Sequence, residues 1–371
     1  MVKIVLVGVG GFARNYVGAL LNSDYEWVGA VDPFFNFSTL KDEILKAGIP
    51  VFNTLEEFYA QGSADLAIIA TPTYLHASQT ITSLEHGSNV LCEKPAAVLP
   101  SDVERMIAAA EKANRFVGVG FQWSYSPAML ALKRDILSGL LGKPKYLKVF
   151  ISWPRGFSYY SRGGGWGGKI SLNGQMVLDS IVSNACAHYV FNMMFLLGDR
   201  IDTAADIKSI EANCLRANNI ENFDTCVMRL TTEGGAKLFY AASHATDRIV
   251  NPIFEYSFEN AVVSYDFDNG GTIKAVFNDG SQKIYGNPNA DNMVKLHDCV
   301  NAVETGIAPV CTAATALPHT RLVEALYKTV PIVDFPKERI KLVEHEDFNG
   351  VCVPGLYEEM RSCWDDMRLM Y

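Results

Sequence analysis

Short apolar runs alternate with helical patterns through the first third of the chain. The apolar runs, each bounded by turn residues or a helix cap, are Lys3–Gly8, Trp27–Asp32, Ala64–Thr71, Asn89–Glu93 and Phe116–Phe121. The segments between them with apolar residues near helical spacing are Phe12–Asn22, Leu55–Gln61, Leu75–His86 and Asp102–Asn114. Ser101 and Glu104 form a capping-box pattern at the start of the last helix. Strands that alternate with helices predict an α/β fold, here a doubly wound Rossmann domain over residues 1–122.

The pattern changes after Gln122. A helix is predicted at Pro127–Leu141 and a strand at Lys145–Trp153. The strand-like runs that follow are Ser209–Leu215, Thr225–Thr231, Lys237–Ser243, Phe254–Phe258, Val262–Phe267 and Thr272–Phe277. Their short links, rich in glycine, asparagine and aspartate, are typical of antiparallel hairpins. The helical patterns that close the domain are Asn292–Glu304 and Ala313–Thr329. We therefore expect residues 123–371 to form an α+β domain on a largely antiparallel open sheet.

Composition narrows the class of protein. A chain of 371 residues suits two domains, and 49% hydrophobic with 20% charged residues is a globular balance. A net charge of −9 disfavours nucleic acid and anionic membranes as partners. No apolar run approaches the ~18 residues of a membrane span, and the N-terminus has the pattern of a strand rather than a signal peptide. The eight cysteines and the histidines show no metal-ligand spacing, so we expect no metal site and reduced thiols in a cytoplasmic protein.

A glycine-rich turn links the first strand to the first helix. The pattern G-x-G-x-x-A is formed by Gly8, Gly10 and Ala13, with Gly11 and Phe12 between them. Such a turn lets the backbone approach a pyrophosphate at a helix N-terminus. Asp32 ends the second strand, where a carboxylate can accept from the adenosine ribose. Because Pro33–Ser38 contains no cation to balance a 2′-phosphate, NAD is favoured over NADP; the alternative is a turn with Asp32 as a loop cap.

Polar residues also follow the fourth and fifth strands, at the sheet edge where open α/β folds bind ligands. The first group contains Thr71, Pro72 and His76, and the second contains Glu93 and Lys94. A partly desolvated lysine beside a cationic nicotinamide can take a proton from an alcohol and return one to a ketone. The alternative for Lys94 is an ordinary exposed lysine after a strand.

The chain resembles the Gfo/Idh/MocA family, named after glucose–fructose oxidoreductase, inositol dehydrogenase and rhizopine catabolism. The resemblance is carried by residues 8–13, 70–76, 86–95, 184–188 and 196–198. It implies that Lys94 is the catalytic acid/base and that the Lys94–Pro95 bond is cis. It also implies an active-site helix segment Asp-x-x-x-His, which here contains Asn184 and His188. Asn184 can only orient a substrate, whereas His188 can relay a proton; a histidine satisfied in the core is the alternative. A spacing of four predicts both side chains on one helix face.

The remaining candidate residues surround these groups. We expect Gln122, with Thr71, Pro72, His76, Glu93 and Lys94, to contact the cofactor. The aromatic and arginine residues expected to bind the substrate are Trp123, Trp153, Arg155 and Trp166. Three of them lie in a glycine-rich segment, residues 153–169, that suits a substrate lid; an oligomer contact or a disordered loop is the alternative. Its glycine and lysine spacing is like that of a P-loop, but Ile170 stands where Mg²⁺ binding needs Ser or Thr.

These observations predict an NAD-dependent oxidoreductase acting on a secondary alcohol of a sugar, glycoside or cyclitol. The alternatives are an NAD-retaining glycoside hydrolase or lyase that oxidises the sugar transiently, and a non-catalytic ligand sensor. The resemblance implies a homodimer or homotetramer assembled through the outer face of the second domain's sheet. The residues expected to need covering there are Val227, Leu238, Tyr240 and Tyr256.

Overall fold

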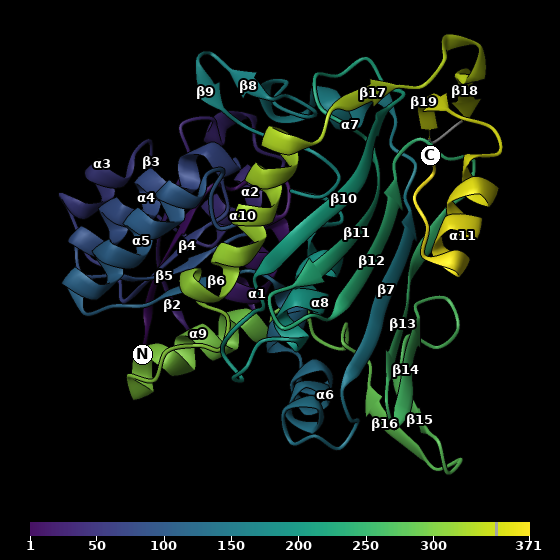
Figure 1. Cartoon of the computed structure of the whole chain (residues 1–371). Helices are drawn as coiled ribbons and strands as arrows, with labels where there is room; N and C mark the ends of the chain where they lie inside the picture. The colour runs from purple at the N-terminus through teal and green to yellow at the C-terminus, as the bar shows by residue number, and fades with distance from the viewer. Residues whose placement is uncertain (346–347) are drawn as a thin grey trace. The chain divides into compact units, whose positions relative to one another are not determined.

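A computed structural model describes residues 1–345 and 348–371. Its contacts divide the chain into two compact units, and Figure 1 labels their elements. Unit 1 comprises Met1–Tyr125 and Asp291–Thr320, and unit 2 comprises Ser126–Ala290 and Arg321–Tyr371. The predicted division after residue 122 lies near the first break, but Asp291–Thr320 packs with unit 1 instead of the second domain. No helix in the described ranges is long and apolar enough to cross a membrane.

Unit 1 is built on a six-stranded parallel sheet with the order β3-β2-β1-β4-β5-β6. Its strands are β1 (Lys3–Val7), β2 (Glu26–Val31), β3 (Val51–Phe52), β4 (Leu66–Ile69), β5 (Asn89–Cys92) and β6 (Val117–Val119). Its helices are α1 (Ala13–Leu21), α2 (Lys41–Lys46), α3 (Leu55–Tyr59), α4 (Thr73–Glu85), α5 (Pro100–Ala113) and α9 (Val294–Thr305), with 3-10 turns η1 (Phe35–Phe37) and η2 (Gln122–Tyr125). The predicted doubly wound fold is confirmed, and this strand order is that of a dinucleotide-binding sheet.

The core of unit 1 explains why the returning segment belongs to it. Strand residues such as Ile4, Leu6 and Ile68 are completely buried in one apolar cluster. Leu296 and Cys299 of α9 lie in the same cluster, also completely buried. The apolar face of α9 is therefore covered by the Rossmann sheet, although about 175 positions of sequence separate β6 from α9.

One helix start differs from the prediction. Helix α5 begins at Pro100, and its N-cap residue is Leu99 with no side-chain cap. The capping box predicted from Ser101 and Glu104 is therefore wrong. Proline is well suited to the first helical position because the N–H that it lacks would have no intrahelical partner there, so the helix starts before Ser101.

Unit 2 is built on a nine-stranded sheet with the order β16-β15-β14-β13-β7-β12-β11-β10-β17. Its strands are β7 (Pro144–Ser152), β10 (Ile207–Arg216), β11 (Thr225–Thr232), β12 (Lys237–Ser243), β13 (Val250–Phe258), β14 (Ala261–Asp266), β15 (Ile273–Phe277), β16 (Gln282–Gly286) and β17 (Ile332–Asp334). Neighbours pair antiparallel except β7 with β12 and β10 with β17. The largely antiparallel sheet is confirmed.

The remaining helices and two small hairpins complete the described chain. The helices are α6 (Pro127–Leu137), α7 (Phe157–Ser161), α8 (Ala187–Leu196), α10 (Ala313–Thr329) and α11 (Leu356–Asp366), with 3-10 turns η3 (Arg162–Gly164) and η4 (Lys337–Arg339). Two hairpins are formed by β8 (Ser171–Leu172) with β9 (Gln175–Met176), and by β18 (Lys341–His345) with β19 (Phe348–Cys352).

Helix α11 covers part of one face of the large sheet, beside β7 and β12 (Figure 1). Its side chains Met360 and Trp364 join Phe150, Val227 and Phe239 of the sheet in one apolar cluster. The sequence analysis did not identify this helix. The residues expected to need a partner subunit, Val227, Leu238, Tyr240 and Tyr256, are at most 1% exposed in the single chain. That argument for an oligomer is wrong because the chain's own elements already cover these residues.

Candidate active site

The glycine-rich turn lies at the carboxyl end of β1 and leads into α1. Gly8 has φ +86°, and a Cβ there would come within 2.8 Å of the carbonyl oxygen of Ala70, so only glycine fits. A Cβ at Gly10 or Gly11 would meet no atom within 4 Å. Helix α1 begins at Ala13 with no side-chain cap. An uncapped helix N-terminus beside open space fits a pyrophosphate group, so these residues can hold a dinucleotide.

Asp32 links the first two strands at this edge. Its Oδ2 accepts from the backbone N–H of Val9 at 2.9 Å, and its Oδ1 accepts from Phe34 at 2.8 Å. Each carboxylate oxygen has a second lone pair, which a ribose hydroxyl can use. The structure also brings two cations to the following loop that the sequence analysis missed. Arg14 Nη2 donates to Thr39 Oγ1 at 3.1 Å, and Lys41 Nζ donates to Asn36 Oδ1 at 2.9 Å.

Glu93 is a buried carboxylate directly before Lys94. It accepts from the Tyr16 hydroxyl at 2.6 Å, from the Lys295 ammonium, and from the Lys94 backbone N–H at 3.2 Å. A Cβ at Gly120 would come within 2.9 Å of its Oε1, so a glycine makes room for it. Burial raises the pKa of Glu93, but the charge and hydrogen bond of Lys295 outweigh burial and hold the pKa below its ordinary value. The carboxylate therefore stays ionised and fixes the backbone at Lys94.

Lys94 itself is half-buried, and the Lys94–Pro95 peptide bond is cis, as expected. His76 contacts the turn that contains Lys94 and Pro95, and it is 1% exposed. Its Nδ1 and Nε2 lie 2.9 Å from the carbonyl oxygens of Pro95 and Thr71, respectively. Burial lowers its pKa. With both ring nitrogens directed at backbone carbonyls, His76 joins the turns after β4 and β5.

Unit 1 contains four other residues that were predicted to contact the cofactor or the substrate. The Thr71 hydroxyl donates to Gln79 Oε1 at 2.6 Å, and Pro72 precedes the first residue of α4. Gln122 Nε2 donates to Asn292 Oδ1 at 3.2 Å. Trp123, predicted to bind substrate, is 2% exposed.

In unit 2, Asn184 lies before α8 and not within it, because the helix begins at Ala187. The prediction that Asn184 and His188 share a helix face is therefore wrong. The segment before the helix forms a separate turn, in which the Ser183 hydroxyl donates to the carbonyl oxygen of Leu178 at 2.7 Å. Serine hydroxyls that bond to nearby backbone favour turns over helix.

The turn contains a carboxylate that the sequence analysis missed. Asp179 is buried, and its Oδ1 accepts from Asn184 Nδ2 at 2.8 Å. Its Oδ2 accepts from the Gly168 backbone N–H at 2.7 Å and lies 3.7 Å from Arg162 Nη2. The amide at position 184 therefore has a carboxylate beside it, supplied from five residues earlier. No regular spacing in the sequence could have identified this pair.

The glycine-rich segment is ordered by arginines against aromatic rings. The Arg162 guanidinium lies 3.6 Å from the ring centroid of Tyr159 and 4.4 Å from that of Trp166. The Arg155 guanidinium lies 5.5 Å from the Trp153 ring and 5.4 Å from the Tyr159 ring. Three of the four predicted substrate residues are thus in one cluster.

This cluster reaches α8 through Tyr189. The Tyr189 ring lies 5.7 Å from the Trp153 ring in an edge-to-face arrangement, and 6.4 Å from the ring of His188. The lid segment, residues 153–169, therefore packs around the same turn and helix that contain Asn184 and His188.

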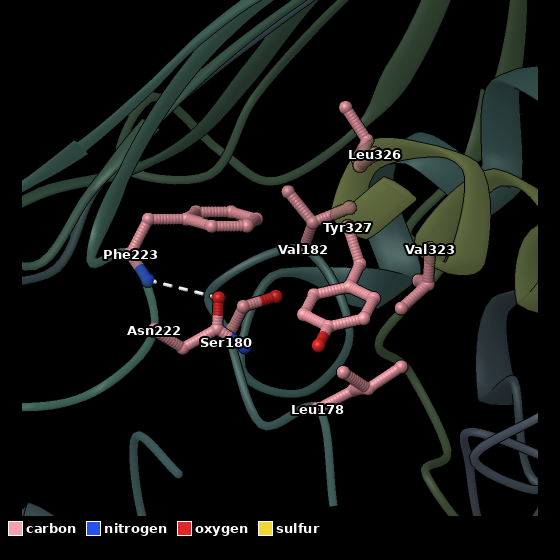
Figure 2. Close-up of a pocket in the computed structure, with 8 residues that line it drawn as sticks. All are labelled: Leu178, Ser180, Val182, Asn222, Phe223, Val323, Leu326 and Tyr327. Carbon is pink, nitrogen blue, oxygen red and sulfur yellow. Dashed lines mark hydrogen bonds between the residues drawn. The ribbon is translucent and has the colours of Figure 1, made fainter. Parts of the chain in front are cut away.

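A separate small pocket lies beside this turn, with an empty volume of about 210 Å³. Figure 2 shows Phe223 on one side of it, with Tyr327 and Val323 on the other. The lining residues are Leu178, Ser180, Val182, Asn222, Phe223, Val323, Leu326 and Tyr327. They include none of the predicted site residues, and the pocket is mainly apolar.

Comparisons with known proteins agree with this geometry. Residues 2–121 match the family model described as the Gfo/Idh/MocA oxidoreductase family, NAD-binding Rossmann fold. The rhizopine catabolism protein MocA of Rhizobium meliloti is 28% identical over 167 residues, which is 44% of this chain and 51% of that protein. Glucose-6-phosphate 3-dehydrogenase of Bacillus subtilis is 29% identical over 150 residues, 40% of this chain and 42% of that protein. The chain thus spans about half the length, or less, of these curated relatives.

A solved structure extends the likeness in fold. The WlbA dehydrogenase from Chromobacterium violaceum, in complex with NADH and UDP-GlcNAcA, is 25% identical with a TM-score of 0.72. The match covers 88% of this chain and 93% of that one. Residues 2–121 are thus similar to the NAD-binding Rossmann domain of the Gfo/Idh/MocA oxidoreductase family, and the chain is similar in fold to the WlbA dehydrogenase.

Proposed function

We propose that this protein transfers hydride between NAD and a secondary alcohol of a sugar, glycoside or cyclitol, with Lys94 as acid/base. The observation that carries the proposal is the position of Lys94. It follows β5 at the edge of the parallel sheet where the glycine-rich turn follows β1. Carboxyl ends of parallel strands share one edge, so the lysine lies on the ligand-binding edge of the sheet. The relatives named for sugar oxidation support the substrate class.

Each part of unit 1 has a defined task in this proposal. Gly8, Gly10, Gly11, Phe12 and Ala13 hold the pyrophosphate, and Asp32 binds the ribose. The nicotinamide supplies the hydride acceptor or donor when the dinucleotide is bound. Lys94, when neutral, takes the proton from the alcohol oxygen, and as an ammonium returns it to the carbonyl. Glu93 is ionised and accepts from three donors, so in this proposal it fixes Lys94 instead of moving the proton.

Unit 2 supplies the substrate-binding groups. Trp153 and Trp166 have aromatic faces that suit the apolar faces of sugar rings. Asn184, oriented by Asp179, and His188 supply hydrogen-bonding groups for substrate hydroxyls.

The test is a panel of sugars, glycosides and cyclitols with NAD⁺, followed by NADH absorbance and product analysis. We expect NADH to form in proportion to an oxidised product. Product without net NADH would favour an NAD-retaining hydrolase or lyase. Ligand binding without any product would favour a sensor.

The variant Lys94→Ala tests whether Lys94 is the acid/base. It should lower turnover by roughly 10²–10⁴-fold and leave NAD binding nearly intact, because it removes only the proton-transfer group. Lys46→Ala, at an exposed lysine of α2, is the control and should retain full turnover. Wild-type turnover in Lys94→Ala would remove the lysine from the mechanism.

A further inference from the structure

Arg155 is a half-buried cation without a carboxylate partner in the described part of the chain. Its guanidinium makes one long hydrogen bond, from Nη1 to the carbonyl oxygen of Pro154 at 3.4 Å. Within the described residues, three other arginines, Arg14, Arg115 and Arg134, also lack an ion pair, but all three are exposed to solvent. A charged group withdrawn from water without a partner destabilises the fold. A bound ligand that pairs with the guanidinium would offset this loss of stability.

Two carboxylates lie near Arg155 among the described residues, and both have other partners. Arg162 lies near Asp179, and Asp179 also accepts from two N–H donors. Asp224, a second carboxylate near the cluster, accepts from N–H groups of Ala217 and Asn218 and from the hydroxyl of Thr225. Neither carboxylate pairs with Arg155.

His244 is neutral and lies beside the cluster, with its ring centroid 5.5 Å from that of Tyr159. Its Nδ1 N–H donates to the carbonyl oxygen of Trp153 at 2.7 Å, so Nε2 has the lone pair. Burial, reinforced by the charge of Arg155, lowers the pKa of His244 to about 3. Nε2 is buried and has no hydrogen-bond partner among the described residues, and the same holds for the Tyr160 hydroxyl.

The Arg155 guanidinium, His244 Nε2 and the Tyr160 hydroxyl indicate which chemical groups a ligand would need in order to bind here. Arg155 requires an oxyanion, because its planar fork of N–H donors fits a carboxylate or phosphate. His244 Nε2 can accept from a hydroxyl, and Tyr160 Oη can donate or accept. The rings of Trp153 and Tyr159 beside Arg155 offer flat apolar faces. A neutral sugar would satisfy the hydroxyl partners but leave the cation unpaired.

We propose that Arg155 binds an oxyanion substituent of the substrate, so that the sugar oxidised by this protein carries a carboxylate or a phosphate. This inference rests on the proposed function and adds the charge class of its substrate. Arg155 is a specificity-determining residue here and takes no part in hydride or proton transfer.

The test compares three hexose probes of different charge: glucose, glucuronate and glucose 6-phosphate. Each is titrated calorimetrically into the full chain saturated with NADH. We expect at least one anionic probe to bind about 10-fold or more tightly than glucose, and the better of the two identifies the oxyanion. Its affinity should weaken as salt concentration rises, while that of glucose should not.

Arg155→Met should abolish this preference by weakening the anionic probes about 10-fold or more and leaving glucose unchanged. Arg155→Lys keeps the charge but loses the fork of donors, so it should retain part of the preference. Arg200→Met, at an exposed arginine of unit 2 paired with Asp202, is the control and should behave as wild type.

Three results would overturn the inference. They are equal affinity of charged and neutral probes, binding of no probe at all, and an Arg155→Met variant that weakens charged and neutral probes alike. Failure of the proposed function has a different signature. In that case the anionic preference would persist in binding, but no hydroxylated compound in the wider panel would yield NADH or an oxidised product.

Discussion

We expect Asp32 to have the most direct effect on cofactor choice. Its carboxylate would repel a 2′-phosphate, so NAD⁺ should bind at least ~10-fold more tightly than NADP⁺, a difference of about 1.4 kcal/mol. Asp32→Ser removes the repulsion and leaves Arg14 and Lys41 beside the loop, so the ratio should fall to about one or reverse. Calorimetry with both dinucleotides measures it, and Asp24→Ser at an exposed position is the control. Equal affinities in the wild type would contradict this role of Asp32.

His244 gives stability a predictable pH dependence. Its pKa in the native state is lowered by burial to about 3, whereas the pKa of an unfolded histidine is ~6.5. Between these values the unfolded state binds a proton that the native state does not, so stability falls as pH falls. From pH 7 to pH 5, His244 should lower the free energy of unfolding by about 2 kcal/mol.

The measurement is urea unfolding of wild type and His244→Gln at both pH values. The loss between pH 7 and pH 5 should be smaller by about 2 kcal/mol in the variant. His86→Gln, at an exposed histidine, should keep the wild-type loss. If His244→Gln loses as much unfolding free energy between pH 7 and pH 5 as the wild type, the His244 imidazole is not held neutral in the native state.

At the level of elements, α9 depends on one buried ion pair. Lys295 is 0% exposed, and its ammonium contacts Glu93 at the turn after β5. It also lies 4.5 Å from the ring of Phe12 in the glycine-rich turn. Helix α9 therefore contacts both the turn after β5, through Glu93, and the glycine-rich turn after β1, through Phe12.

Removing one partner of such a pair leaves an uncompensated buried charge. Lys295→Met should therefore lower the free energy of unfolding by about 3–5 kcal/mol. The double variant Lys295→Met/Glu93→Gln should recover part of that loss, because no unpaired charge remains. Denaturant unfolding of the two single variants and the double variant gives the coupling. A double variant no more stable than Lys295→Met would show that lost packing, and not charge, causes the effect.

For the whole molecule, we expect a homodimer or homotetramer, although the contact does not involve the buried Val227, Leu238, Tyr240 and Tyr256. Val262 and Val276 face each other across β14 and β15 and are 41% and 39% exposed. Ile284 of β16 is 69% exposed and on the same face, because its partner Lys274 is two residues from Val276. This apolar strip lies on the sheet face that α11 covers only in part.

Light scattering should give a multiple of 40.8 kDa at micromolar concentration. Val276→Glu/Ile284→Glu should shift the protein towards the monomer, because charges would be buried in the contact. Val333→Glu, at an exposed position on the edge strand β17, is the control. A wild-type mass of one chain would contradict the prediction.

The sequence by itself determined the elements and the dinucleotide turn. Apolar periodicity predicted nearly all the longer strands and helices, because burial imposes the same spacing wherever an element packs. The elements it missed are short, such as β3 and α2, or lie after the last predicted helix, such as α11, and α8 was implied only by the family resemblance. The G-x-G-x-x-A turn and Lys94 were also identifiable, because their geometry depends on residues close together in the chain.

Only the tertiary structure decided what those residues touch. Lys295 meets Glu93 across about 200 positions of sequence, and α9 belongs to unit 1 because its apolar face is buried there. Asp179 lies beside Asn184, Arg14 and Lys41 lie beside the loop after Asp32, and Arg155 lacks a carboxylate among the described residues. Charge pairing and burial depend on distance in space, and local spacing contains no information about contacts that chain folding alone creates.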